Sequence, residues 1–107
     1  MNKIENIFSN LPKSTDEVIE ILVRSPNVRI ERIISSGNTS PDSFWYDQNE
    51  NEWVILLKGS AKIEFEDEMV HLKSGDYLLI PSHKKHRVAE TSRTEKTIWL
   101  AIFYQTK

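Results

Sequence analysis

Turn-forming residues divide most of this chain into segments that are too short for ordinary helices. Downstream of Pro26, polar turn signals recur at residues 35–43, 49–51, 59–60, 67–68 and 74–76. The segments between them are rich in apolar residues, as strands are. Short strands at close, regular spacing are typical of an antiparallel sandwich or barrel. The turns alone therefore predict an all-β fold.

Two of the predicted strands are apolar on both faces. Residues 61–66 alternate between apolar and charged, as does the stretch at 28–32, and each predicts a half-buried strand. Residues 52–57 and 97–104 instead have apolar side chains on both sides, so both of their faces need cover. The N-terminal segment can cover one face and a second subunit the other. We therefore expect a homodimer.

Composition excludes several classes of protein. The 107 residues carry a net charge of −2 without a long block of like charge, so no nucleic-acid partner is predicted. No apolar run approaches the roughly 20 residues that span a membrane, and residues 1–10 do not resemble a secretion signal. The absence of cysteine excludes disulfides and thiolate ligands and fits the cytoplasm. We expect a cytoplasmic protein that is not bound to a membrane.

Two motifs within residues 37–90 resemble those of the cupin family, whose members are small double-stranded β-helix (jelly-roll) barrels. The first cupin motif ends with an acid, six residues and a glycine, which Glu52 and Gly59 match. The second runs from a glycine through a proline to a histidine, which Gly75, Pro81 and His86 match. The resemblance implies an all-β cupin barrel.

The N-terminal residues show a different pattern, which predicts a short helix. Ser14 and Glu17 have the spacing of a helix capping box, and Val18, Ile21 and Leu22 follow at helical spacing. The Ser-Pro pair at 25–26 then ends the predicted helix. We expect one cupin domain over residues 1–107, with a helical segment at 1–26 that packs on a β-barrel at 28–104.

The sequence departs from the first cupin motif at positions that carry chemistry. The family has two histidines, one residue apart, before the acid that Glu52 matches. Here their places fall on Tyr46 and Gln48 or on Trp45 and Asp47, depending on the spacing to Glu52. The first motif therefore retains its acid and lacks both histidines.

The second motif also departs from the family pattern. His83 replaces a glycine and Glu90 replaces an asparagine, while the histidine is retained as His86. The family's set of three histidines and a glutamate, all metal ligands, is thus reduced. The resemblance implies these candidate metal ligands: Asp47, Gln48, Glu52 and His86.

The chemistry of this set favours a divalent ion. Two carboxylates in a partly dry cavity repel each other, and a charge of +2 removes that repulsion. Oxygen donors with one imidazole suit Mn²⁺ or Fe²⁺ and also admit Zn²⁺ or Ni²⁺. We prefer Asp47 to Gln48 because a charged oxygen binds a cation more strongly than an amide. The alternative is that Glu52 starts a strand within an ion pair and that His86 hydrogen-bonds to the backbone.

Aromatic residues near the first motif are candidates for a small-molecule pocket. Trp45 and Tyr46 belong to the core by default, and they line a cavity if the strand follows the barrel mouth as it does in cupins. His83 is a further pocket candidate, and its alternative is an exposed turn beside Lys84 and Lys85. A small molecule is therefore the expected partner.

These observations lead to a metal-binding cupin with a small-molecule pocket and an unspecified reaction. For an enzyme, the resemblance implies dioxygenase, isomerase or decarboxylase chemistry. The alternative function is a non-catalytic binding or sensor module that holds a small ligand without metal, which the lost histidine pair favours. A third possibility is a purely structural dimer. Fold alone does not decide among them.

Overall fold

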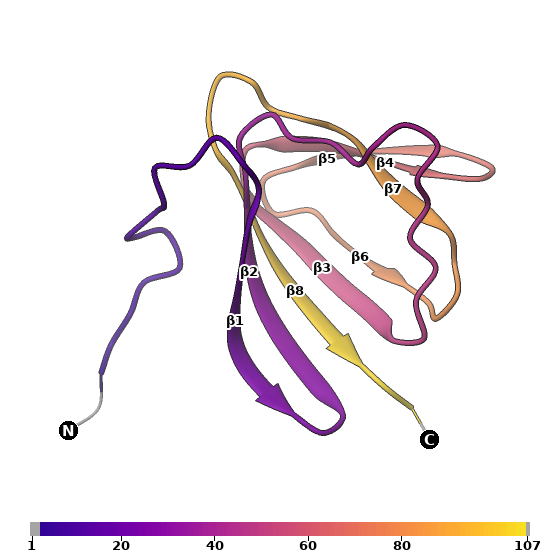
Figure 1. Ribbon diagram of the computed structural model, residues 1–107, viewed down its shortest axis with the longest axis horizontal. Coiled ribbons are helices and arrows are strands. Elements are labelled where there is room, and N and C mark those ends of the chain that lie inside the picture. The colour runs from indigo at the N-terminus through magenta and orange to yellow at the C-terminus, as the bar shows by residue number, and fades with distance from the viewer. Residues whose placement is uncertain (1–2, 107) are drawn as a thin grey trace.

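The computed structural model describes residues 3–106, which form eight strands and no helix. The strands lie in two antiparallel sheets that face each other (Figure 1). The order is β1-β2-β8-β3-β6 in the larger sheet and β5-β4-β7 in the smaller. The bounds are β1 Val18–Ser25, β2 Val28–Ser35, β3 Asn51–Lys58, β4 Ser60–Phe65, β5 Met69–Lys73, β6 Tyr77–Ile80, β7 His86–Thr91 and β8 Thr97–Tyr104. The all-β prediction is confirmed, and this part of the chain has no helix that is long and apolar enough to cross a membrane.

The helix predicted within residues 1–26 is wrong. Residues 18–25 form the edge strand β1, which pairs with β2 from Val18 opposite Ile34 to Ser25 opposite Val28. Pro26 and the residue after it make the turn of this hairpin, so the signal interpreted as a helix stop marks a reversal between strands.

Two physical reasons favour the strand over the helix. Half of β1 is β-branched, which favours extended backbone, and β2 supplies partners along its whole length except at a bulge between Ile21 and Val23. The capping-box residue Ser14 instead accepts a hydrogen bond of 3.0 Å from the amide of Asp16, a local turn that no helix follows. The β-branched residues of β1 are Val18, Ile19, Ile21 and Val23.

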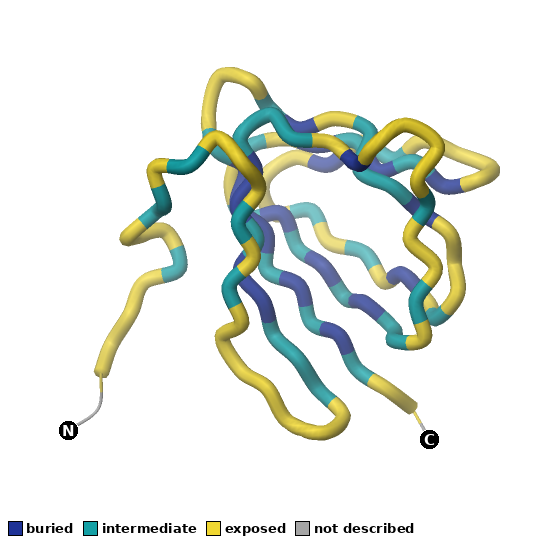
Figure 2. Tube along the Cα trace, viewed as in Figure 1, coloured by how far each residue is buried: buried dark blue, intermediate teal, exposed yellow. Residues whose placement is uncertain are grey.

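The pairing register of the larger sheet decides which side chains face inward. Arg29, Phe103, Glu52 and Ile80 are direct partners across β2, β8, β3 and β6, so they share one face. That face packs against the smaller sheet, and buried positions alternate with half-buried ones along β3 and β8 (Figure 2). The buried core comprises Val54, Leu56, Ala61, Ile63, Phe65, Leu72, Ile80, Trp99, Ala101 and Phe103.

The loop between β2 and β3 extends the smaller sheet at its β7 edge. The amide of Tyr46 donates to the carbonyl of His86 at 2.8 Å, and the amide of His86 donates back at 3.1 Å. Further along, the amide of Ser40 donates to the carbonyl of Val88 at 2.9 Å. These bonds fix residues 45–48 against the start of β7, where the two cupin-like motifs meet.

Candidate ligand cavity and metal centre

A cavity of about 260 Å³ lies between the two sheets. A cavity of about 150 Å³ is enough to hold benzene, so this one has room for a single substituted ring or a short aliphatic molecule. Its apolar walls are Ile19, Ile33, Val54, Ile63, Ile80, Val88, Trp99 and Phe103. Its polar lining comprises Glu17, Arg29, Glu31, Tyr46, Gln48, Glu52 and His86.

Glu52, Gln48 and His86 meet in the wall of this cavity. Glu52 is the second residue of β3 and His86 the first of β7, and their side chains are only 11% and 7% exposed. The Nε2 atom of His86 lies 3.5 Å from Oε1 of Glu52, and the amide nitrogen of Gln48 donates to the same oxygen at 3.1 Å. The fold thus brings three of the four candidate ligands together.

A backbone hydrogen bond fixes the imidazole ring of His86. Its Nδ1 lies 3.0 Å from the carbonyl oxygen of Lys84, and because a carbonyl only accepts, Nδ1 carries the hydrogen. In the neutral ring Nε2 then carries no hydrogen, and its lone pair faces the carboxylate of Glu52. Two electron-rich atoms in this position repel unless a positive charge lies between them. That charge can be a proton or a metal ion.

The pKa of His86 shows that the site attracts a proton. Burial lowers the pKa of this imidazole, but the hydrogen bonds to Glu52 and to the carbonyl of Lys84, together with the negative charge of Glu52, outweigh burial. The net result is a pKa above the ordinary value of 6.5. A metal ion at Nε2 would therefore have to displace this proton.

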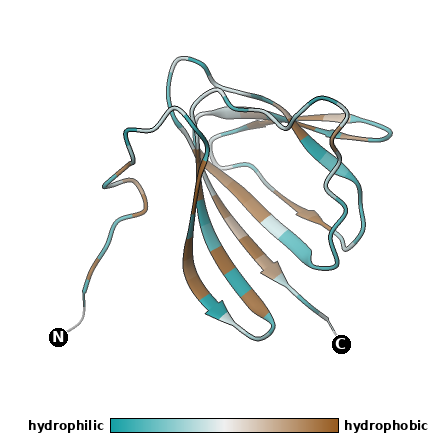
Figure 3. Cartoon of the chain, viewed as in Figure 1, coloured by the Kyte–Doolittle hydropathy of each residue, from teal (hydrophilic) through white to brown (hydrophobic). Residues whose placement is uncertain are grey.

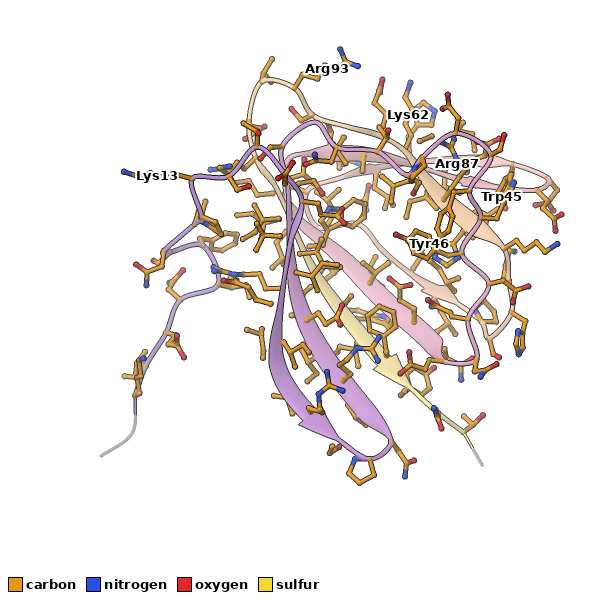
Figure 4. The ribbon with its side chains drawn as sticks, viewed as in Figure 1. Lys13, Trp45, Tyr46, Lys62, Arg87 and Arg93 are labelled. Carbon is orange, nitrogen blue, oxygen red and sulfur yellow. The ribbon has the colours of Figure 1, made fainter. Side chains whose placement is uncertain are left out.

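The two aromatic pocket candidates, Tyr46 and Trp45, differ in position (Figure 4). Tyr46 lines the cavity, and its ring stacks on that of His86 with centroids 5.5 Å apart. Burial raises the pKa of the Tyr46 hydroxyl, and the negative charges of Glu17 and Glu52 raise it further. Trp45 is half-buried, and it is not part of the cavity lining.

Asp47 and His83 form a pair outside the cavity lining. Nδ1 of His83 lies 2.7 Å from Oδ1 of Asp47, and the two side chains are 62% and 43% exposed. The backbone amide of His83 also donates to the carbonyl of Gln48 at 2.8 Å, which ties the two loops together. Contrary to the preference for Asp47, Gln48 is the neighbour that reaches Glu52. His83 has a φ of 64°, a conformation that the glycine of the cupin motif adopts without strain.

Three charged residues in the cavity were not among the predicted site residues: Glu17, Arg29 and Glu31. Nε of Arg29 lies 2.7 Å from Oε2 of Glu31, and its Nη1 lies 2.8 Å from Oε2 of Glu50. The guanidinium carbon lies 4.2 Å from the centroid of the Phe103 ring. For Glu17 the sequence signal is a capping box, and for Arg29 and Glu31 it is the alternation at 28–32, which predicts a strand with one polar face. That polar face lies toward the cavity.

The donor set fits a metal site with few protein ligands. Within residues 3–106 there is no group of three or more His, Cys, Asp or Glu side chains that could hold a metal ion. The cluster instead offers one imidazole, one carboxylate and one amide. Three protein donors leave the remaining positions of a divalent ion to water or to a ligand, as in open metal centres.

The family of the chain follows from comparison with known proteins. The family model described as "Cupin domain" matches residues 32–103, which contain both motifs together with Gln48, Glu52 and His86. This chain belongs to the cupin family. The double-stranded β-helix implied by the resemblance is thereby confirmed for this cupin. No curated protein matches its sequence.

Solved structures agree with this assignment. A protein from Ralstonia eutropha JMP134, named as a proposed mannose-6-phosphate isomerase, is 41% identical to this cupin with a TM-score of 0.93. The match covers 98% of this chain and 100% of that chain. A cupin superfamily protein from Desulfitobacterium hafniense DCB-2 is 21% identical with a TM-score of 0.76, and the match covers 90% and 84% of the two chains. The second likeness concerns the fold alone.

Proposed function

We propose that this cupin binds a small molecule in the cavity between its sheets and a divalent metal ion at Gln48, Glu52 and His86. The observation that carries the proposal is the position of His86 Nε2, which faces the Glu52 carboxylate at 3.5 Å in the cavity wall while Nδ1 bonds to the carbonyl of Lys84. The donor types favour Mn²⁺ or Fe²⁺ and admit Zn²⁺ or Ni²⁺.

Each residue of the proposed centre has a distinct role. The carbonyl of Lys84 orients His86 so that Nε2 faces the cavity, and Glu52 supplies the negative charge. Gln48 would present its amide oxygen, which requires a rotation of the amide away from its present bond to Glu52. A bound divalent ion supplies Lewis-acid chemistry, or oxygen chemistry in the case of iron.

The Ralstonia protein is named as a proposed isomerase, so we consider isomerisation among the reactions that could take place in the cavity of this cupin. An isomerase of this kind moves a proton between adjacent carbons, which requires a group that can accept and return it. Glu52, His86 and Glu17 are titratable groups in the cavity lining. Proton transfer on a small molecule is therefore the reaction type that we propose for an enzymatic role.

A second candidate function is a binding module without metal, and one observation favours it. Glu52 already accepts a hydrogen bond from Gln48. Because the pKa of His86 is raised, its Nε2 can carry a proton that faces the carboxylate of Glu52. The cluster is then satisfied by its own groups, and the polar end of the cavity can hold a ligand directly. We also propose the cytoplasm as the location, from the absence of cysteine.

Elemental mass spectrometry tests the metal proposal. The protein is purified without chelators, incubated with Mn²⁺, Fe²⁺, Ni²⁺ or Zn²⁺ in turn, desalted and analysed. We expect about one metal ion per chain in the wild type and in His71→Ala, a control histidine that is exposed on β5. His86→Ala is expected to lose the ion. A wild type that takes up none of the four ions would favour the metal-free binding module.

A further inference from the structure

Glu17 occupies a second acidic position in the cavity, apart from the proposed metal centre. It immediately precedes β1, whose residue Ile19 lines the same cavity. The negative charges of Glu17 and Glu52 both raise the pKa of the Tyr46 hydroxyl. Both carboxylates therefore act on the hydroxyl of Tyr46, and Glu17 is a second group in the cavity lining that can accept a hydrogen bond from a ligand.

Glu17 has no cationic partner among residues 3–106, because no lysine, arginine or histidine nitrogen lies within salt-bridge distance of it. Its one side-chain hydrogen bond comes from the hydroxyl of Ser35, at a long 3.4 Å. That hydroxyl accepts the indole N–H of Trp99 at 3.2 Å, which leaves its own hydrogen free for Glu17. The carboxylate is thus only weakly solvated by the protein.

The surroundings of Glu17 disfavour its charge. Burial raises the pKa of this carboxyl, and the bond from Ser35 lowers it only in part. Glu17 is exposed at the mouth of the cavity, so it keeps much of its water until a ligand enters. A hydrogen-bond donor on that ligand then replaces the water that the ligand displaces from the carboxylate. A group that lacks a partner in the protein is therefore suited to recognising one from outside.

The charged residues of the cavity lining disfavour anionic ligands. Three carboxylates line it, and Arg29 is the only lysine or arginine among the lining residues. The guanidinium of Arg29 is already held by Glu31 and Glu50. When protonated, His86 also carries a positive charge in this cavity, but its ring faces Glu52. A carboxylate or phosphate near Glu17 would therefore meet like charge, since both cationic groups of the lining are already paired.

We infer that Glu17 selects ligands that carry an amino or hydroxyl group on a small apolar body, by accepting a hydrogen bond from that group. The inference rests on the proposed small-molecule role of the cavity, and it assigns the chemical class of the ligand. The apolar body contacts the walls around Ile19 and Trp99, and its donor group lies at Glu17. An ammonium group gains more from this contact than a hydroxyl because the bond is charge-assisted.

Four probes with one shared ring test this inference: toluene, benzyl alcohol, benzylamine and benzoate. Their binding to the metal-free protein at neutral pH is measured by calorimetry for the wild type, Glu17→Gln and the control Glu66→Gln. Glu66 is exposed and lies outside the cavity. We expect wild-type affinity in the order benzylamine, benzyl alcohol, toluene, with benzoate weakest. Glu17→Gln is expected to weaken benzylamine by about two- to fivefold, the usual worth of an exposed ion pair, and to leave toluene unchanged.

The outcomes separate this inference from the proposed function. Equal affinity of the wild type and Glu17→Gln for benzylamine, with toluene bound by both, would overturn the role of Glu17 and leave the ligand cavity standing. A wild type that binds none of the four probes would overturn the cavity proposal, and the inference with it. Because Glu17 is exposed and forms no ion pair within residues 3–106, Glu17→Gln is expected to fold about as stably as the wild type at neutral pH.

Discussion

The contact between His86 and Glu52 makes the stability of this cupin depend on pH. The folded-state pKa of His86 lies above the unfolded value of 6.5, so the charged imidazole stabilises the fold. This contribution is fully present below about pH 6.5 and is lost as the pH rises through the folded-state pKa. We therefore expect the melting temperature of the metal-free protein to fall between about pH 6 and pH 9.

Thermal unfolding of His86→Gln beside the wild type checks this expectation. The variant lacks the titrating imidazole, so its melting temperature should fall less over the same range, while the exposed-residue control His71→Gln should follow the wild type. Added metal should reverse the trend, because its binding needs the unprotonated ring and strengthens as pH rises. Parallel profiles for the wild type and His86→Gln would contradict the assigned proton.

The residues of the site differ in how far their sequence context reveals them. Glu52 and His86 stand at motif positions, and the structure places both in the cavity wall. Arg29 and Glu31 follow the ordinary alternation of a half-buried strand, which assigns charged side chains to solvent. The ion pair between Arg29 and Glu31 offsets part of the cost of turning both charges inward. The sequence pattern of one strand does not reveal that this pair forms in the folded protein.

At the scale of elements, the strands are predictable where turn residues bound them. The exception is β1, whose apolar residues Val18, Ile21 and Leu22 satisfy a helical spacing as well as a strand. The strand forms because β2 lies beside it, joined by a hairpin turn at Pro26. The spacing of apolar residues within β1 carries no information about the strand beside it. Whether a segment forms a strand depends strongly on such neighbours.

The turns between strands have unequal tolerance for side chains, which two glycines demonstrate. Gly59 has a φ of +94°. A Cβ added to Gly59 would lie only 2.8 Å from the Cα of Thr97. Gly75 has a nearly equal φ of +93°, but an added Cβ meets nothing within 4 Å. Both substitutions by alanine carry conformational strain, and only the first also carries a steric clash with β8.

We expect Gly75→Ala to lower the free energy of unfolding by about 1–3 kcal/mol, the usual cost of a strained backbone. Gly59→Ala should lower it by a further 1–3 kcal/mol or so, the typical cost of overpacking. Urea denaturation of the two variants measures the difference directly. Equal losses would show that the backbone near Thr97 moves aside without cost.

At the scale of the whole molecule, the larger sheet is rich in hydrophobic residues, drawn brown in Figure 3, and an apolar row crosses all five of its strands on the outer face. One row of direct pairs runs Val23, Ile30, Ile102, Trp53 and Leu79. Val23 is 49% exposed and Leu79 is 51% exposed in the single chain. At about 4.8 Å between strands, the row is some 20 Å wide, comparable to a protein interface.

The N-terminal segment covers only part of this face. The guanidinium of Arg32, on the outer side of β2, donates to the carbonyls of Ile7 and Ser9 at 3.1 Å and 2.7 Å. The row of apolar residues at β3 and β6 remains open, as the two-faced strands of the sequence suggested. We propose that a second copy of this cupin covers it, which gives the expected homodimer.

Sedimentation velocity tests the dimer. The wild type should sediment as a dimer, and Leu79→Glu should shift it to the monomer because a charge would be buried in the interface. Met69→Glu is the matched control, since Met69 is 45% exposed on the smaller sheet. A monomeric wild type at high concentration would contradict the proposal, and so would a dimer that Leu79→Glu leaves intact.

We propose that the wall of the cavity holds a divalent ion, and that the exposed pair of Asp47 and His83 does not. The most direct measurement is an anomalous difference map from a crystal of the wild type soaked in Mn²⁺. We expect one strong peak at coordination distance, about 2.0–2.3 Å, from Nε2 of His86 and an oxygen of Glu52. A peak between Asp47 and His83, or no peak beside His86, would contradict it.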